Sequence, residues 1–315
     1  MENFTLITLE NNFPHVYYTN VDRKVDRKYY MESQFKKYNI KFTRLEMPSC
    51  PKDGPPQEFL KSLIGMYSNN TSHWINWYSS LLFDFMKDWI RNTKDDFFIF
   101  MEDDYDLSLI PYWHFSWNEL LERLPYDWDC IQLGFESPDI ISFYLHPTKS
   151  QYSLGPSLLR REYVEKLIDL HCVGNGYKFD YTIANSIYID RDSGIHDRLS
   201  YDQTSGGPDY YINQSGKCYS LPLIPINPYF SGISHQGPFG ELSWHPKLSF
   251  IKCYEAYYEW WINDKNNFTL DEFFTYGKDN DMLMERDISR WDDKYFEQKA
   301  LNCREEFLTY YEFKR

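Results

Sequence analysis

The stretch FFIFMEDDYD, residues 97–106, joins an apolar run to a cluster of carboxylates. Its first five residues have the length and composition of a short buried strand. Glu102, Asp103 and Asp104 follow at once, and like charges that close repel and raise one another's pKa. A cation would relieve the repulsion, so the stretch predicts a strand that ends at a cation site. A solvated acidic loop after a strand is the alternative.

Strands and helices alternate on both sides of this stretch. The alternation predicts a layered α/β domain with a mainly parallel sheet. We expect that domain to span residues 1–245 and the acidic, aromatic tail to form a helical extension, 246–315, packed on it. The expected strands are 15–21, 41–47, 97–101 and 129–134, and the expected helices are 25–39, 74–89 with Thr71 or Ser72 as N-cap, 117–124 and 161–171.

In an open α/β sheet, ligands bind outside the carboxyl ends of the strands. If 97–101 is a central strand, Glu102, Asp103 and Asp104 lie at such an end. Side chains two positions apart in an extended segment point the same way, so Glu102 and Asp104 could face one ion together. Hard oxygen ligands of this kind favour Mg²⁺ or Mn²⁺, which also bind phosphate oxygens.

Composition excludes some classes of function. The 315 residues carry 33 Lys and Arg against 47 Asp and Glu, a formal charge of -14, which disfavours a nucleic-acid partner. The six cysteines are scattered without a CxxC pair, so we expect reduced core thiols rather than a zinc site. The N-terminus lacks the basic flank and apolar run of a signal peptide, and no segment is apolar enough to span a membrane. We therefore expect a cytoplasmic protein.

Six motifs, in order along residues 14–240, resemble glycosyltransferase family 25, which contains lipopolysaccharide galactosyltransferase-like proteins and collagen galactosyltransferases. YYTNVDRKVDR resembles the N-x-D-R-x-x-D-R opening of that family. The others are GMYSNNTSHWINW, FIFMEDDYD, DWDCIQLG, LGPSLLRREYVEKLI and GGPDYYI. Gly65-Met66 replaces a Gly-Cys nearer to Ser-His, Gly155-Pro156 replaces Ala-Tyr, and the last 75 residues match no motif of the family.

The resemblance implies a GT-A-like (Rossmann-like) fold, a mostly parallel mixed sheet flanked by helices. It also implies inverting, divalent-metal-dependent transfer of a sugar from a nucleotide-sugar donor, expected to be UDP-linked, to a hydroxyl of a glycan or protein acceptor. The cofactor is expected to be Mn²⁺ or Mg²⁺. Asp104 is the expected main metal ligand, Glu102 a second ligand or a ribose contact, and His235 a late ligand that completes the shell.

The resemblance assigns the donor pocket and the catalytic base as well. The expected donor-side residues are Asn20, Asp22, Arg23, Arg27, His73, Glu102 and Asp103. Arginine suits bidentate phosphate contact, although Asp22 could instead cap a helix beside surface arginines, and His73 could be a cap. Asp209 is the expected base, with Asp180, Asp202 and Glu136 next in line. A turn or capping aspartate is the alternative for Asp209.

Three rival functions use the same residues. A metal-dependent phosphoesterase would require further His and Asp motifs, which the sequence lacks. A glycosyltransferase-like binding protein without activity is disfavoured by the intact Glu-Asp-Asp. A DNA-base glycosyltransferase is disfavoured by the charge of -14. Donor hydrolysis separates the binding protein from an enzyme.

Overall fold

The computed structural model describes residues 13–48, 54–64, 70–135, 140–148, 155–179, 208–228, 248–274 and 284–299. Four residues with expected roles lie outside these ranges: Glu136, Asp180, Asp202 and His235. The backbone of His73 and Asp209 is described, but their side chains are not.

Seven strands form one sheet in the order β2-β1-β3-β7-β4-β10-β6. Five of them run in the same direction, and β7 and β6 run antiparallel to their neighbours. The strands are β1 (Val16–Val21), β2 (Phe42–Met47), β3 (Phe97–Met101), β4 (Cys130–Gln132), β6 (His146–Pro147), β7 (Ser157–Arg160) and β10 (Cys218–Ser220). The expected α/β fold with a mostly parallel mixed sheet flanked by helices is confirmed.

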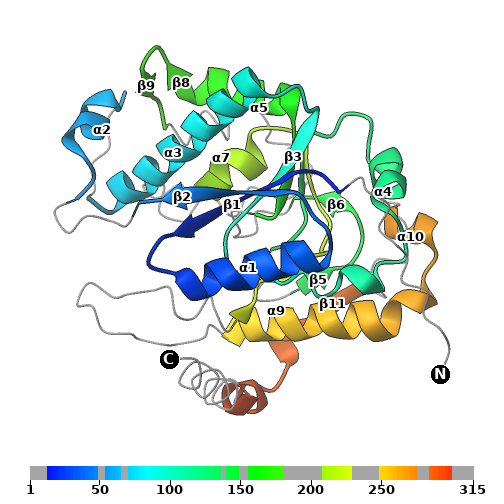
Figure 1. The fold of residues 1–315 in the computed structure, drawn as a ribbon. Coiled ribbons are helices and arrows are strands. Elements are labelled where there is room, and N and C mark those ends of the chain that lie inside the picture. Colours follow the sequence, from blue (N-terminus) through cyan, green and yellow to red (C-terminus); the bar gives the residue numbers. More distant parts are fainter. Residues whose placement is uncertain are drawn as a thin grey trace.

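Helices cover both faces of this sheet (Figure 1). On one face α1 and α9 pack against the strands, and on the other face α3, α5 and α7 do so. The helices of these two layers are α1 (Val25–Lys37), α3 (Asn70–Asn92), α5 (Arg161–His171), α7 (Pro208–Gln214) and α9 (Leu248–Glu259).

Shorter elements complete the described fold. Two small pairs of strands lie beside the main sheet, with β5 against β11 and β8 against β9. These strands are β5 (Ile140–Ser142), β8 (Cys172–Val173), β9 (Gly176–Tyr177) and β11 (Glu285–Asp287). The short helices are α2 (Gln57–Ser62), η1 (Ile110–Tyr112), α4 (Trp117–Arg123), η3 (Trp260–Asp264), η4 (Lys265–Asn267), α10 (Leu270–Phe274) and η6 (Ile288–Arg290).

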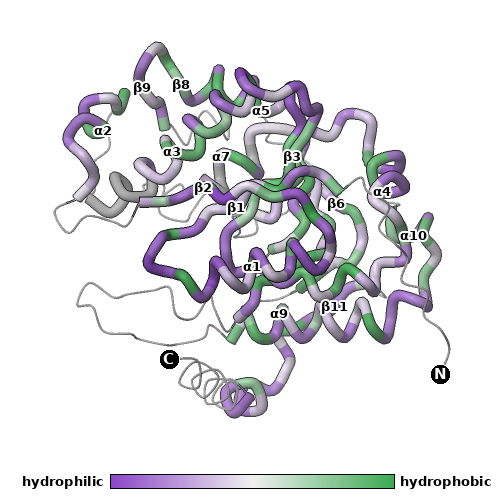
Figure 2. The backbone as a smooth tube through the Cα atoms, viewed as in Figure 1, coloured by the Kyte–Doolittle hydropathy of each residue, from purple (hydrophilic) through white to green (hydrophobic). Residues whose placement is uncertain are grey.

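The side-chain alternation of the strands explains why both faces are covered. In β3, Ile99 and Met101 enter the core on the α1 face, while Phe98 and Phe100 enter the core on the α3 face. All four side chains are fully buried. A strand buried on both faces is a continuous apolar run rather than an alternating one, and Figure 2 shows β3 as hydrophobic while α1 is mostly hydrophilic.

The expected helices and strands are present with small shifts of their ends. One detail is wrong: Thr71 and Ser72 lie inside α3, which already includes Asn70, so neither residue caps it. The apolar spacing that starts at Trp74 fixes the face of the helix but not its first residue. Strand β7 lies between β3 and β4 and pairs antiparallel with both.

The tail contributes to the same core as the sheet. Tyr257, Trp260 and Trp261 are at most 1% exposed and share a core cluster with residues of β1, β3 and β4. Residues 248–274 and 284–299 therefore pack on the sheet, and the boundary at residue 245 stays a prediction. No helix in the described ranges is both long enough and apolar enough to cross a membrane.

The described cysteines have the expected state. Cys130, Cys172, Cys218 and Cys253 are free thiols, and all but Cys172 are buried.

Candidate functional site

The carboxyl ends of the adjacent strands β1 and β3 lie at the switch point of the sheet, where the order of the strands reverses. From β1 the chain passes through α1 to β2 on one side, and later through α3 to β3 on the other side. Because α1 and α3 lie on opposite faces, a crevice is expected between the ends of these two strands, and it is where open α/β sheets bind ligands. Residues 102–106, which we call the acidic loop, follow β3 at this point.

Asp103 links the acidic loop to the first strand. Its Oδ2 accepts a hydrogen bond from Asn20 Nδ2 at 2.6 Å, and its Oδ1 accepts one from Arg27 Nη1 at 2.7 Å. Asn20 is near the end of β1 and Arg27 is in the first turns of α1, and all three residues are less than 10% exposed. Two motifs that are far apart in the sequence thus form one buried polar cluster.

Arg27 supplies a positive charge in the middle of the carboxylates. Its Nη1 also lies 3.8 Å from Asp104 Oδ2. Burial alone would lower the pKa of this guanidinium, but the charges of Asp104, Asp103 and Glu102 outweigh burial and raise the pKa. The arginine is therefore permanently charged, and it offsets part of the repulsion within the acidic loop.

Asp104 and Glu102 are more accessible than Asp103. The side chain of Asp104 is 13% exposed against 9% for that of Asp103, and Glu102 is half-buried. The backbone carbonyl of Asp104 accepts a hydrogen bond from Asn227 N at 2.6 Å, which fixes the position of the residue.

The backbone of the acidic loop is held from two sides. Gln34 of α1 donates from Nε2 to Tyr105 O at 3.1 Å and accepts at Oε1 from Leu107 N at 2.6 Å. On the other side Tyr105 forms an isolated bridge with Ile226, and Asp106 N donates to Pro225 O at 2.9 Å. With its main-chain groups paired, this loop presents its side chains in a fixed arrangement.

Asp106 connects the acidic loop to α9. Its Oδ2 accepts hydrogen bonds from the hydroxyls of Tyr254 at 2.6 Å and Tyr258 at 2.9 Å, and its Oδ1 accepts one from Ser108 N at 2.8 Å. Burial and the Asp106 charge raise the pKa of both hydroxyls, that of Tyr258 to about 12. Asp106 therefore has a structural role, whereas the side chain of Asp104, two positions earlier, is 13% exposed.

A second basic residue, Arg44 of β2, lies beside Asn20. It donates from Nε to Asn20 Oδ1 at 2.9 Å and forms an ion pair with Asp22. The hydrogen bond from Arg44 lowers the pKa of the Asp22 carboxyl. Arg44 and Asp103 together therefore orient the Asn20 amide. Asp22 and Arg23 are exposed just beyond β1.

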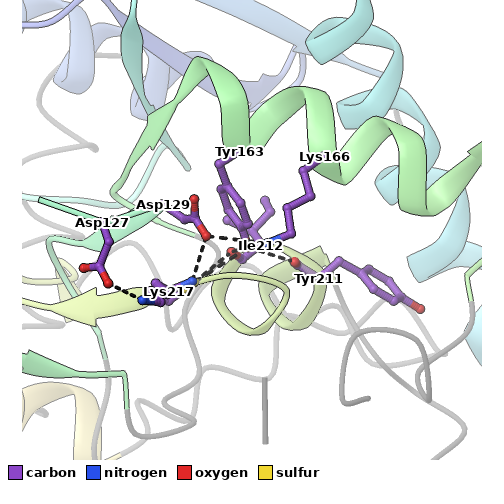
Figure 3. A network of polar contacts seen from close by, with 8 residues as sticks. Asp127, Asp129, Tyr163, Lys166, Tyr211, Ile212 and Lys217 are labelled. Carbon is purple, nitrogen blue, oxygen red and sulfur yellow. Dashed lines mark hydrogen bonds and ion pairs between the residues drawn. The ribbon is translucent and has the colours of Figure 1, made fainter. Parts of the chain in front are cut away.

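Asp209 lies in the first turn of α7. Two hydrogen bonds hold the C-terminal part of α7 and the segment after it near the start of β4 (Figure 3). Tyr163 OH donates to Ile212 O of α7 at 2.5 Å, and Asp129, just before β4, accepts from Lys217 N at 2.9 Å. Because Lys217 directly precedes β10, α7 runs back along the sheet and its first turn lies toward the carboxyl ends of the parallel strands. The backbone thus puts Asp209 on the side of the acidic loop.

Tyr211, next to this position, is not available to stack on a sugar. It is 2% exposed, and its ring packs against His171 and Phe179 with centroids 4.7 and 5.5 Å away. His73 lies in the first turns of α3.

Gly155 brings the backbone before β7 close to the end of β3, because a Cβ on Gly155 would lie 2.6 Å from Phe100 O. Gly134 allows a similar close approach to the segment after β10, since a Cβ there would collide with Ile224 O. Gly155 therefore has a packing reason for its lack of a side chain, because any side chain would push β7 away from β3.

The residues of the acidic loop fit a divalent cation only in part. Within the part of the chain that the structure describes, three or more His, Cys, Asp or Glu side chains do not converge on one point. Both oxygens of Asp103 already accept hydrogen bonds from the protein. Mg²⁺ and Mn²⁺ commonly bind one or two carboxylates together with phosphate oxygens and water. Asp104 and Glu102 would suffice for that mode, and Asp103 would not take part.

A cavity of about 570 Å³ lies between the end of α9 and residues 291–296. It shares Tyr258 with the contacts of Asp106. It is lined by Glu255, Tyr258, Glu259, Ile262, Asn263, Trp291, Asp292, Tyr295 and Phe296.

Comparisons with known proteins do not identify the chain. No protein-family model and no curated protein matches it. Among solved structures, A197 from STIV is similar at 9% identity and a TM-score of 0.33, over 68% of this chain and 84% of that one. The glycosyltransferase GlyE of Streptococcus pneumoniae TIGR4 is similar at 12% identity and a TM-score of 0.31, over 82% and 62%. TM-scores this low carry no conclusion about this chain.

Sequence reasoning missed the residues that hold the acidic loop. Gln34, Asn227, Tyr254 and Tyr258 come from three other parts of the chain, and none belongs to a recognisable motif. Their partner Asp106 lies in the stretch 97–106, and nothing in the local sequence distinguishes its role from that of Asp104.

Proposed function

We propose that this chain is a glycosyltransferase. It moves a sugar from a nucleotide-sugar donor, UDP-linked, to a hydroxyl of a glycan or protein, with inversion and with a divalent cation as cofactor. The relationship to glycosyltransferase family 25 and the GT-A type of the fold are part of this proposal. It rests on the residues of the site and on the motifs in the sequence.

One observation carries the proposal. Asn20 and Arg27, from the first motif, bind Asp103 of the Glu-Asp-Asp motif at the ends of two adjacent strands. These motifs are 76 or more residues apart in sequence, and either could have been a loop elsewhere on the surface. Their meeting at the switch point of the sheet is what a nucleotide site of this class requires.

The proposed roles follow from accessibility. Asp104 and Glu102 hold the cation, which when bound neutralises the negative charge that develops on the leaving diphosphate. Arg23 is exposed beyond β1, and we propose that it contacts a donor phosphate. Arg27 is 6% exposed and binds Asp103, so we assign it to holding the acidic loop rather than to phosphate contact.

In an inverting transfer, the acceptor oxygen attacks the anomeric carbon as the bond to the diphosphate oxygen breaks. The proton of the acceptor hydroxyl must go to a base on the opposite side from the leaving group. We propose Asp209 for this base, because the first turn of α7 lies toward the strand ends. His235 and His73 remain candidates for the metal shell and the donor phosphate, respectively.

Thermal shift with a panel of nucleotide sugars, with and without Mn²⁺, tests the proposal. We expect UDP-linked donors to raise the melting temperature only when Mn²⁺ is present. A cation-independent shift would contradict the metal role, and no shift with any nucleotide would contradict the function. Binding of a donor without hydrolysis or transfer would favour the binding-protein alternative. A cytoplasmic location would be checked by fractionating the cells that make the protein.

A further inference from the structure

Arg27 lies where a bridging cation would be expected. Its Nη1 is 2.7 Å from Asp103 Oδ1 and 3.8 Å from Asp104 Oδ2, so one nitrogen contacts two carboxylates. Surface lysines near acidic loops can move away, but Arg27 is 6% exposed and cannot leave without uncovering Asp103. Asn20 takes the remaining oxygen of Asp103.

We propose that Arg27 is a resident counter-cation that keeps Asp103 out of the metal shell and weakens divalent-cation binding until a nucleotide is bound. This inference extends the proposed function, because it depends on a cation at Asp104 and Glu102. In the free protein, those two carboxylates attract a divalent ion, while the positive charge of Arg27 repels it. A diphosphate adds negative charge and oxygen ligands, and the ion then binds well.

The contacts of Arg27 distinguish this role from a purely structural one. A structural ion pair needs only Asp103, and removal of the Arg27 charge alone would then affect stability but not cation affinity. A counter-cation for the acidic loop must also act on Asp104, and Arg27 Nη1 lies 3.8 Å from Asp104 Oδ2 as well as 2.7 Å from Asp103 Oδ1. Removing that charge should therefore change cation affinity.

The test is a titration of the full-length protein with Mn²⁺ alone, in which the electron paramagnetic resonance signal of the free ion reports how much Mn²⁺ is unbound. Arg27→Gln removes the charge and can still donate a hydrogen bond to Asp103. We expect it to bind Mn²⁺ roughly tenfold tighter or more than the unchanged protein, since a unit charge a few ångströms away acts on a divalent ion. Arg27→Lys, which keeps the charge, should stay within about threefold of the unchanged protein.

A charge-balanced double variant keeps the inference testable even if Arg27→Gln does not fold. Arg27→Gln with Asp103→Asn has no buried charge at these positions, and the asparagine oxygen can accept from Asn20 while its amide donates to the glutamine. We expect Mn²⁺ affinity within about threefold of the unchanged protein, because Asp103 is not a ligand and the net charge is the same. A tenfold loss would identify Asp103 as a ligand and overturn the inference.

Adding UDP separates this inference from the proposed function. If UDP tightens Mn²⁺ binding to the unchanged protein, the nucleotide–metal site exists. Equal or weaker binding of Mn²⁺ alone to Arg27→Gln then overturns only the role of Arg27. If UDP has no effect on Mn²⁺ binding, the proposed function fails, whatever the arginine variants do.

Discussion

At the scale of single residues, two neighbouring carboxylates have different tasks. Asp103 accepts hydrogen bonds from Asn20 and Arg27, while the side chain of Asp104 is 13% exposed and has its Oδ2 3.8 Å from Arg27 Nη1. Substitution of the first should therefore affect folding, and substitution of the second should affect binding.

We predict that Asp103→Ala lowers the free energy of unfolding by about 3–5 kcal/mol, because it leaves the buried guanidinium of Arg27 without its closest partner. Urea denaturation measures the change. The control is Asp22→Ala, at an exposed ion pair with Arg44, which should lower stability far less because solvent screens exposed ion pairs. Equal losses in the two variants would contradict the assignment of Asp103.

Asp104→Asn should have the opposite effect, a loss of binding with little loss of stability. It keeps the shape of the side chain and the backbone contact with Asn227, so we expect it to lower stability less than Asp103→Ala does. Mn²⁺-dependent binding of UDP should be lost, since an amide is a much weaker ligand for a hard cation than a carboxylate. Isothermal titration calorimetry measures the binding, and unchanged affinity would remove Asp104 from the proposed site.

At the scale of secondary-structure elements, two helices bring distant residues to the strand ends. Helix α9 donates two tyrosine hydroxyls to Asp106, which fixes the far end of the acidic loop. Helix α7 has its first turn, with Asp209, toward the same edge, and its end is anchored through Tyr163 and Asp129.

The tyrosine contacts of α9 predict a loss of stability at high pH. A hydroxyl whose pKa rises to about 12 on folding stays protonated in the folded chain, while the unfolded chain releases its proton near the model-peptide value of about 10. The contribution of the Tyr258 hydroxyl to stability is therefore fully present below about pH 10, and it is lost as the pH rises toward about 12. Urea midpoints across this range should fall less steeply for Tyr258→Phe than for the unchanged protein.

Tyr126→Phe is the matched control for that experiment, because Tyr126 is 91% exposed. It should leave the pH dependence as it is in the unchanged protein. A slope that is the same in all three proteins would show that Tyr258 does not contribute.

The placement of α7 gives the prediction for catalysis. If Asp209 is the base, Asp209→Asn should lower kcat by about 10²–10⁴, the usual contribution of a positioned general base. The KM for the donor should remain near that of the unchanged protein, because the base acts on the acceptor side. An Asp209→Asn variant with full kcat would move the search to Glu136, Asp180 and Asp202.

At the scale of the whole molecule, the tail is part of the core. Trp261 is fully buried, and its Nε1 donates to Pro222 O at 2.9 Å, in the segment that leads to Asn227 and the acidic loop. The tail thus supports the site as well as the fold.

A chain that ends at residue 245 should therefore fail to fold. It would lose Tyr257, Trp260 and Trp261, and large-to-small losses of single buried aromatic rings already cost about 3–5 kcal/mol each. Their sum is comparable to the whole stability of a domain, about 5–15 kcal/mol. Circular dichroism should show no cooperative melting. A folded 1–245 fragment would establish the boundary expected from the sequence.

The sequence by itself determined the elements and the place of the carboxylates. Periodicity and apolar runs depend on neighbours a few residues apart, so β1, α1, β3 and α5 could be predicted with nearly correct ends. The position of Glu102, Asp103 and Asp104 after a buried strand, at the edge where ligands bind, was also accessible from pattern alone.

Only the tertiary structure decided which carboxylate binds what. Asn20 and Asp103 are 83 residues apart in sequence, and Tyr254 and Asp106 are 148 apart. No local pattern encodes such pairs, because a hydrogen bond depends on where packing brings the two side chains. The sequence raised the question of a cation beside the carboxylates. The fold supplied Arg27, whose guanidinium became a partner of Asp103 once α1 packed on the sheet.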